Sequence, residues 1–118
     1  MISCEFISIE DDEPDIVISF SCAKEIYDQE QDVIIQRTPK YEYALPEYER
    51  GAHVSVGYGS DEINVLKSIE LSGRNVIING DRVIEERDCE KIDNDEWAYF
   101  KDALMKMNFD NSFELKIA

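Results

Sequence analysis

Basic side chains and long apolar runs are both scarce in this sequence. Of its 118 residues, 12 are Lys or Arg and 27 are Asp or Glu, so the formal net charge is −15. A surface of that sign repels the phosphates of nucleic acids and the headgroups of anionic membranes, which excludes both as expected partners. Apolar runs such as Val33–Ile35 and Val76–Ile78 stop after three residues, whereas a membrane-spanning helix needs about 20.

Cysteine and histidine are also rare. The three cysteines, Cys4, Cys22 and Cys89, are an odd number without CxxC spacing, and His53 is the one histidine. They are too few and too dispersed to predict a zinc site or a disulfide framework. We expect reduced thiols, with Cys4 and Cys22 buried in strands. We also expect a cytoplasmic protein, because the first six residues lack the basic and apolar regions of a secretory leader.

A recognisable catalytic combination is missing as well. His53 lies in a strand-like stretch beside Val54, where a structural role is far more common than general-base catalysis. Cys89 is surrounded by carboxylates that disfavour its thiolate, the form needed for nucleophilic attack. The acidic run at residues 10–15 lacks the alternating ligands and central glycine of a helix-loop-helix calcium site. The sequence therefore predicts no enzyme, no metal site and no cofactor.

The chain nevertheless has the composition of a folded protein. Hydrophobic residues make up 43% and aromatic residues 10%, which is more than acidic disordered chains contain. A chain of this length can bury roughly two-thirds of its unfolded surface. We expect residues 1–118 to form one domain.

Most of the chain alternates between apolar and polar residues, the pattern of half-buried strands. Such stretches cover residues 2–9, with a bulge near Phe6, and residues 15–22, 32–37, 52–56, 65–71, 76–78 and 82–85, with 113–117 able to add an edge strand. Short turn sequences at residues 72–75 and 79–81 connect the later stretches. These close connections predict an antiparallel meander.

One segment is typical of an amphipathic helix. Asp93 can cap its first turn, Glu96 can complete a capping box three residues later, and Asn108 is a plausible end. The apolar face recurs at spacings of three, four and three, as Trp97, Phe100, Leu104 and Met107. The predicted fold class is α+β: an antiparallel β-sheet of six or seven strands, packed on one face by a C-terminal helix.

Residues 38–50 break the alternation and indicate a loop of about a dozen residues, a length often associated with function. Tyrosines offer contact area to a protein partner, and glutamates offer a field for a cationic one. The candidate partner-binding residues are Tyr41, Glu42, Tyr43, Glu47, Tyr48 and Glu49. The alternative is a loop whose tyrosines pack down on the sheet.

From Asp32 onward the sequence resembles a known family. An apolar strand ending in Gln36-Arg37, an acidic loop leading to Gly51, a Tyr58-Gly59 element and an Ile-x-Leu strand at residues 69–71 occur in the order found in the immunity protein 10 family. The resemblance covers roughly residues 15–107. Members are encoded beside toxins of bacterial polymorphic toxin systems and are thought to protect the producing cell.

The residues that match the family are Gln36, Arg37, Gly51, Tyr58 and Gly59. The resemblance gives none of them a role in toxin contact. Gly51 and Gly59 could serve backbone geometry alone, and Gln36-Arg37 could serve a hydrogen-bond network at the end of a strand.

These observations predict a cytoplasmic immunity protein that binds a cognate toxin domain and blocks it without catalysis. Many such toxins act on nucleic acids and are basic, so an acidic inhibitor would be steered toward them. The alternatives are an acidic mimic of nucleic acid that inhibits a defence nuclease, or a small enzyme without a recognisable motif. A homodimer formed through an exposed sheet edge stays open.

The negative charge is denser in the first part of the chain. Residues 1–50 hold 13 acidic and 4 basic side chains, a net of −9, and residues 51–118 hold 14 and 8, a net of −6. The hairpin turn near residue 13 and the tyrosine loop are therefore the region where we expect a basic partner to dock.

Overall fold

The computed structural model describes residues 2–12, 15–22, 31–46, 50–57 and 64–117. In this part of the chain the elements are β1 (Ile2–Ser3), β2 (Phe6–Asp12), β3 (Asp15–Ser21), β4 (Val33–Arg37), the 3₁₀-helix η1 (Pro39–Ala44), β5 (His53–Val56), β6 (Asn64–Ser72), β7 (Asn75–Gly80), β8 (Ile84–Asp88), α1 (Asn94–Met107) and β9 (Glu114–Ile117). The strands form one mixed sheet with the order β1-β8-β7-β6-β5-β4-β3-β2, and β9 pairs with β6 beside this path.

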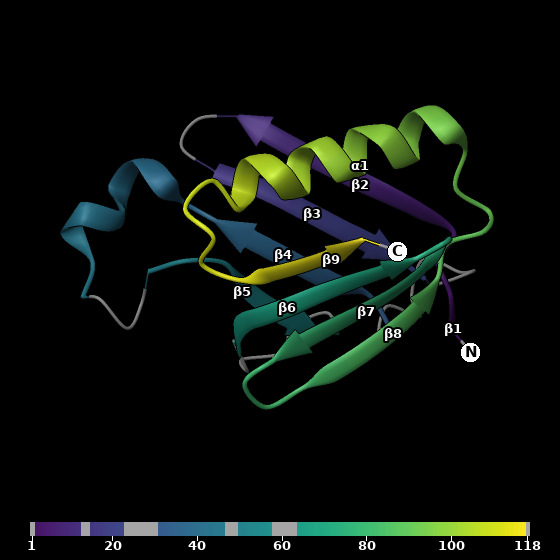
Figure 1. The fold of residues 1–118 in the computed structure, drawn as a ribbon, viewed down its shortest axis with the longest axis horizontal. Coiled ribbons are helices and arrows are strands. Elements are labelled where there is room, and N and C mark those ends of the chain that lie inside the picture. Colours follow the sequence, from purple (N-terminus) through teal and green to yellow (C-terminus); the bar gives the residue numbers. More distant parts are fainter. Residues whose placement is uncertain (1, 13–14, 23–30, 47–49, 58–63, 118) are drawn as a thin grey trace.

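The strands from β2 to β8 form the predicted meander, since each pairs antiparallel with the next along the chain. The α+β class is confirmed, with α1 packed on the sheet (Figure 1). The described residues form nine strands where the sequence predicted six or seven. The two short terminal strands, β1 and β9, pair parallel to β8 and β6, so the sheet is mixed.

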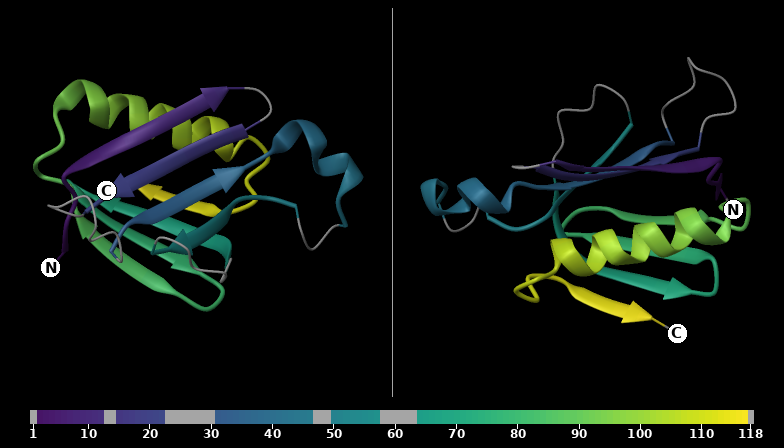
Figure 2. Two further views of the ribbon diagram at one scale, coloured as in Figure 1. Left: turned by 180° about the vertical axis from the view of Figure 1, so that it is seen from behind. Right: turned by 90° about the horizontal axis from the view of Figure 1, so that it is seen from above.

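The sheet is folded into two layers, which Figure 2 shows edge-on in its right-hand view. The first layer contains β2, β3 and β4, and the second contains β6, β7, β8 and β9. Apolar side chains at alternate strand positions point into the space between the layers. For example, Ile16, Ile18 and Phe20 of β3 are buried, whereas their neighbours are partly exposed.

The predicted single strand over residues 2–9 is interrupted at Cys4 and Glu5. The backbone N–H of Cys4 donates to the carbonyl oxygen of Asp88 in the second layer at 2.8 Å, and that of Glu5 donates to Ser21 in the first layer at 2.8 Å. The chain therefore changes layers here, which a sequence pattern of alternating residues does not reveal. The first and last strands of the sheet order, β1 and β2, are consecutive in the chain.

The strand predicted at residues 82–85 lies further along the chain, at Ile84–Asp88. The N–H of Gly80 donates to the carbonyl oxygen of Val83 at 2.7 Å, so Asp81 and Arg82 belong to the tight turn. The strand extends to Asp88 and therefore includes Arg87, which lies at a buried position and is 0% exposed.

The helix α1 begins and ends where the sequence predicts. The Asp93 carboxylate accepts a hydrogen bond from the N–H of Glu96 at 2.7 Å, and Asn108 is the C-terminal cap. The Glu96 side chain does not complete the capping box, because it accepts the N–H of Ile7 in β2 at 2.8 Å. Glu96 thus ties the first turn of the helix to the edge of the first layer.

The buried face of α1 closes the core on one side. Its predicted apolar residues are all buried, and the Phe100 ring meets Phe20 of β3 edge-on at a centroid distance of 5.3 Å. In the described part of the chain, no helix combines the length and the apolar character needed to cross a membrane.

Candidate functional site: an arginine-anchored tyrosine segment

Half of the predicted tyrosine loop is a helix. Pro39 fixes the backbone at the start of η1, and hydrogen bonds from Tyr41 N–H to the Thr38 carbonyl at 3.3 Å and from Leu45 N–H to the Glu42 carbonyl at 3.0 Å hold the turns. The prediction of an irregular loop over residues 38–50 is therefore wrong for Pro39–Ala44. A 3₁₀-helix this short has no amphipathic period for a sequence pattern to detect.

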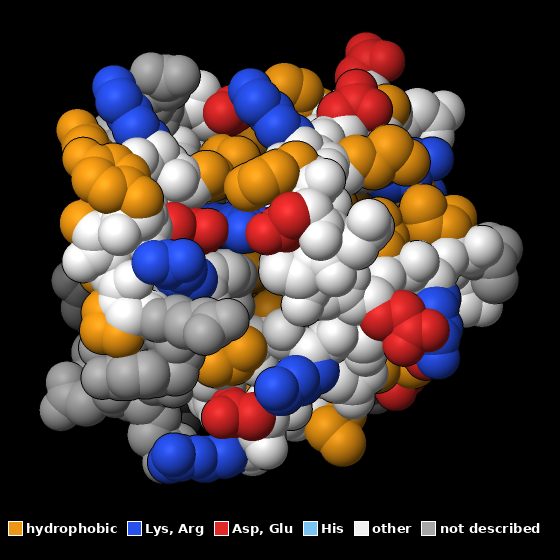
Figure 3. Space-filling view, turned by 60° about the vertical axis from the view of Figure 1, so that its left-hand side comes forward, with side chains coloured by type: hydrophobic (Ala, Val, Ile, Leu, Met, Phe, Trp, Pro, Cys, Tyr) orange, Lys and Arg blue, Asp and Glu red, His pale blue; other side chains and the backbone are white. Residues whose placement is uncertain are grey.

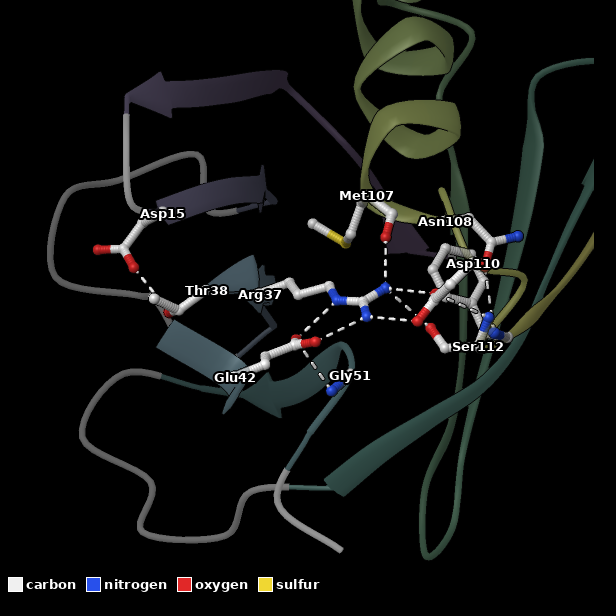
Figure 4. A network of polar contacts seen from close by, with 10 residues as sticks. Asp15, Arg37, Thr38, Glu42, Gly51, Met107, Asn108, Asp110 and Ser112 are labelled. Atoms are coloured by element: carbon white, nitrogen blue, oxygen red, sulfur yellow. Dashed lines mark hydrogen bonds and ion pairs between the residues drawn. The ribbon is translucent and has the colours of Figure 1, made fainter. Parts of the chain in front are cut away.

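Arg37, the last residue of β4, anchors this segment. Its side chain is only 1% exposed, and its guanidinium lies at the centre of the contacts drawn in Figure 4. Two nitrogens donate to the two carboxylate oxygens of Glu42 at 2.8 and 2.9 Å, and two donate to those of Asp110 at 2.9 Å each. Both are bidentate pairs, the arrangement in which arginine binds carboxylates most firmly.

Two further acceptors complete the hydrogen bonding of the Arg37 guanidinium. Nη1 donates to the carbonyl oxygen of Met107 at 2.7 Å and to the Ser112 hydroxyl oxygen at 3.0 Å. The Phe109 ring covers the guanidinium, with its centroid 4.3 Å from Cζ. The cation therefore joins the end of β4 and η1 to the last turn of α1 and the segment after it.

Glu42 has a different orientation from the one the sequence suggested. We expected it to face a cationic partner, but its side chain is 13% exposed and is paired with Arg37. The same carboxylate accepts the N–H of Gly51 at 3.1 Å. Gly51 has a φ of +95°, a conformation that L side chains rarely adopt. We call Pro39–Ala44, with the exposed Tyr41 and Tyr43, the tyrosine segment. Glu42 joins this segment to Arg37 and Gly51 and is not part of its exposed surface.

The pKa values in this cluster follow from the hydrogen bonds. The bond from Arg37 lowers the pKa of Glu42 and lowers that of Asp110 to about 2. Burial lowers the pKa of Arg37, but the hydrogen bonds to Glu42 and Asp110 outweigh it and leave that pKa raised. All three groups are therefore charged at neutral pH, and one cation faces two anions.

Tyr41 and Tyr43 project from η1 into solvent, with 47% and 78% of their surface exposed. The alternative prediction, that the loop tyrosines pack down on the sheet, is wrong for these two. Figure 3 looks onto this end of the molecule, where hydrophobic side chains lie among charged ones of both signs. The other three candidates, Glu47, Tyr48 and Glu49, lie outside the described residues.

Two hollows border the Arg37 network. One, of about 530 Å³, is lined by Arg37, Glu42 and Gly51 together with His53 and the β7–β8 turn. The other, of about 730 Å³, lies between the end of α1 and β9, and Ser112 is part of its wall. The tyrosine segment therefore stands beside concave surface that a partner's side chains could enter.

Sequence reasoning missed most of the residues that build this site. It suggested a hydrogen-bond network at the strand end for Gln36-Arg37, and for Arg37 that is confirmed. The partners Asp110 and Ser112, and the covering ring of Phe109, lie more than 70 residues further along the chain. The one feature of the sequence that could have indicated this site is Arg37, a charged residue at an inward position of the apolar strand β4.

The cysteines do not contribute to this site. Cys4, Cys22 and Cys89 are free and buried, as the sequence predicted for the first two. Contact with Cys22 lowers the pKa of Cys4, but contact with Cys89 and burial outweigh it and raise that pKa to about 12. Such a thiol is protonated at neutral pH and is a weak nucleophile. Among the described residues, no group of three or more His, Cys, Asp or Glu is arranged to hold a metal ion.

The stability of the protein should depend on pH through this network. Glu42 and Asp110 have lower pKa values in the folded chain than their ordinary 4.5 and 3.8. Their contribution is therefore complete above about pH 4.5 and is lost as the pH falls toward 2. Urea unfolding between pH 5 and pH 2.5 should show a shallower loss of stability in Arg37→Met than in the wild type. If the free energy of unfolding falls equally steeply with pH in both proteins, Arg37 is not the cause of the lowered pKa values of Glu42 and Asp110.

Comparison of the chain with protein-family models, with curated proteins and with solved structures found no match.

Proposed function

We propose that this chain is an immunity protein that neutralises a cognate toxin domain by binding it in a one-to-one complex, without catalysis. The observation that carries the proposal is the anchored tyrosine segment. Arg37 fixes η1 through two hydrogen bonds to Glu42, while Tyr41 and Tyr43 are exposed. Aromatic side chains on a fixed backbone lose little conformational freedom on binding, which favours their use as contact residues.

The surface charge supports a basic partner. Two buried cations, Arg37 and Arg87, are paired with carboxylates inside the protein. The net charge of the whole chain is −15. A field of this kind accelerates the encounter with a cationic protein and opposes contact with nucleic acid or anionic lipid.

The resemblance to the immunity protein 10 family supports the choice of a toxin as that partner. A nuclease-type toxin carries a basic groove for its substrate, and an acidic protein seated there would occlude it. The proposed place of action is the cytoplasm of the toxin-producing cell. Glu47, Tyr48 and Glu49 remain part of the predicted contact region.

Co-expression tests the proposal directly. Cells that express the toxin encoded beside this gene should survive when they also express this chain, and the two proteins should co-purify in a one-to-one complex. A toxin that kills equally well in the presence of the chain would overturn the proposal. Finding the gene within a phage operon, with no toxin beside it, would favour the nucleic-acid mimic.

The tyrosines provide a sharper prediction. Tyr43→Ala and Tyr41→Ala should each weaken toxin binding about tenfold, equivalent to about 1.4 kcal/mol, because each removes a large exposed ring from the contact. Isothermal titration calorimetry with purified toxin measures the change. Tyr99→Ala is the matched control, because Tyr99 is 53% exposed on α1 and outside the tyrosine segment. Affinities equal to that of Tyr99→Ala would count against the segment as a contact.

A further inference from the structure

Three buried thiols meet at one corner of the fold, where the end of β8 and the start of β2 come together (Figure 1). Cys4 lies where the chain changes layers, Cys22 directly follows β3 of the first layer, and Cys89 directly follows β8 of the second. Their exposures are 0%, 9% and 0%, and all three are free. The Cys4 thiol interacts with the thiols of both Cys22 and Cys89. Cys4 therefore has two neighbouring thiols.

The pairing of β1 with β8 sets Cys4 beside Cys89. Ser3 lies opposite Asp88 in this parallel pair, and the N–H of Cys4 donates to the carbonyl oxygen of Asp88 at 2.8 Å. The next two residues in the same register are Cys4 and Cys89, and both are buried. Neighbouring strands lie about 4.8 Å apart, and a disulfide needs a Cα separation of about 4.4–6.8 Å. A bond between these two thiols therefore fits the backbone as it stands.

Cys22 is placed differently. The strands β2 and β3 pair antiparallel with Phe6 opposite Ser21, so the residue level with Cys22 is Glu5 and not Cys4. In the reduced protein the Cys4 thiol donates to the carbonyl oxygen of Phe6 at 3.2 Å. Cys22 thus approaches Cys4 diagonally, from the first layer, and is the less suitable partner for a bond.

The strand before Cys4 is the least firmly held element of this corner. β1 has two residues and, among the described residues, pairs with β8 alone. Short terminal segments open at a low free energy, and opening of β1 brings Cys4 into solvent. While it is buried, the Cys4 thiol has a pKa raised to about 12 and stays protonated. An exposed thiol has a pKa of about 8.5 and reacts as the thiolate. Oxidation of Cys4 therefore proceeds through the opening of β1.

We propose that Cys4 and Cys89 form a disulfide under oxidising conditions, and that this bond locks β1 to β8. The oxidant is a small-molecule disulfide such as oxidised glutathione. The thiolate of Cys4 attacks one of its sulfurs and releases one glutathione thiolate, which leaves a mixed disulfide. As β1 returns to β8, the Cys89 thiol loses its proton and attacks the Cys4 sulfur, releasing the second glutathione thiolate. The protein gives up two protons and two electrons, and one glutathione disulfide becomes two thiols. This device is independent of the toxin.

Oxidation of the purified protein tests the proposal. After incubation with oxidised glutathione and blocking of the free thiols, peptide mapping by mass spectrometry should find Cys4 joined to Cys89. The oxidised form should unfold at a temperature about 10 °C higher than the reduced form, and dithiothreitol should reverse the shift. A bond between Cys4 and Cys22, a chain that carries only glutathione adducts, an unreacted chain or an unchanged unfolding temperature would each overturn the proposal.

Two variants separate the neighbouring thiols. Cys89→Ala should lose the rise in unfolding temperature, whereas Cys22→Ala, which also removes a buried sulfur, should keep it. If Cys89→Ala does not fold, Cys89→Val keeps the apolar volume and takes its place. Hydrogen exchange then measures the lock itself: the Cys4 amide should exchange at least about tenfold more slowly in the oxidised protein, because the bond suppresses the opening of β1. Equal exchange rates in the two forms, or a rise that Cys89→Ala retains, would contradict the proposal.

Discussion

Replacing Arg37 with methionine is expected to lower the free energy of unfolding by about 3 kcal/mol. The change leaves the Glu42 carboxylate, 13% exposed, and the Met107 carbonyl without their buried donor. Removing one partner of a buried ion pair costs about 3–5 kcal/mol. We expect the lower end of that range because the Asp110 side chain is 44% exposed and water can solvate it. Urea denaturation monitored by Trp97 fluorescence measures the loss.

Two variants control this experiment. Arg50→Met removes an exposed arginine that donates to the carbonyls of Leu45 and Tyr43, and should cost less than about 1 kcal/mol. Combining Arg37→Met with Glu42→Gln and Asp110→Asn should recover part of the loss, because no unpaired charge then stays at the site. If Arg37→Met proves as mild as Arg50→Met, the network does not hold the tyrosine segment in place.

The second large effect is expected for Phe100→Ala, with a loss of about 3–5 kcal/mol. The Phe100 ring is 0% exposed and packs against Phe20 at 5.3 Å and Trp97 at 5.1 Å between ring centroids. Its removal leaves a cavity where the helix meets the first layer. The loss should appear in both chemical and thermal unfolding.

The neighbouring residue provides the control for Phe100. Tyr99 is 53% exposed on the helix surface, so Tyr99→Ala should cost less than about 1 kcal/mol. Similar losses for the two variants would mean that the burial of the Phe100 ring does not determine the effect, since alanine is the better helix former at both positions. The same Tyr99→Ala protein is the folded control for the toxin-binding measurements on Tyr41→Ala and Tyr43→Ala.

Local patterns predicted the elements of this fold well. The alternation of apolar residues located β3 and β4, because the period of two follows directly from the geometry of a half-buried strand. The capping residue Asp93 located the start of α1 for a similar reason, since the interaction spans three residues. Each of these features depends on neighbours in the sequence.

The features that escaped prediction depend on distant residues. The break at Cys4 arises because β1 pairs with β8, and Glu96 leaves its capping role because Ile7 of β2 lies within reach. In the candidate site, Arg37 and Asp110 are 73 positions apart. A charged residue on the inward face of a strand predicts that some partner exists, but its identity is decided only when the layers come together.

The pairing of the first strand with the eighth also has a consequence for the order of folding. Ile2 lies opposite Arg87, so this contact closes a loop of 85 residues, while most other pairings join strands adjacent in the chain. Closing a long loop costs entropy before the contact returns any stability. The hairpins can therefore form early and locally, and we expect the hydrogen bonds between β1 and β8 to form last. During synthesis, the first strand leaves the ribosome long before its partner exists.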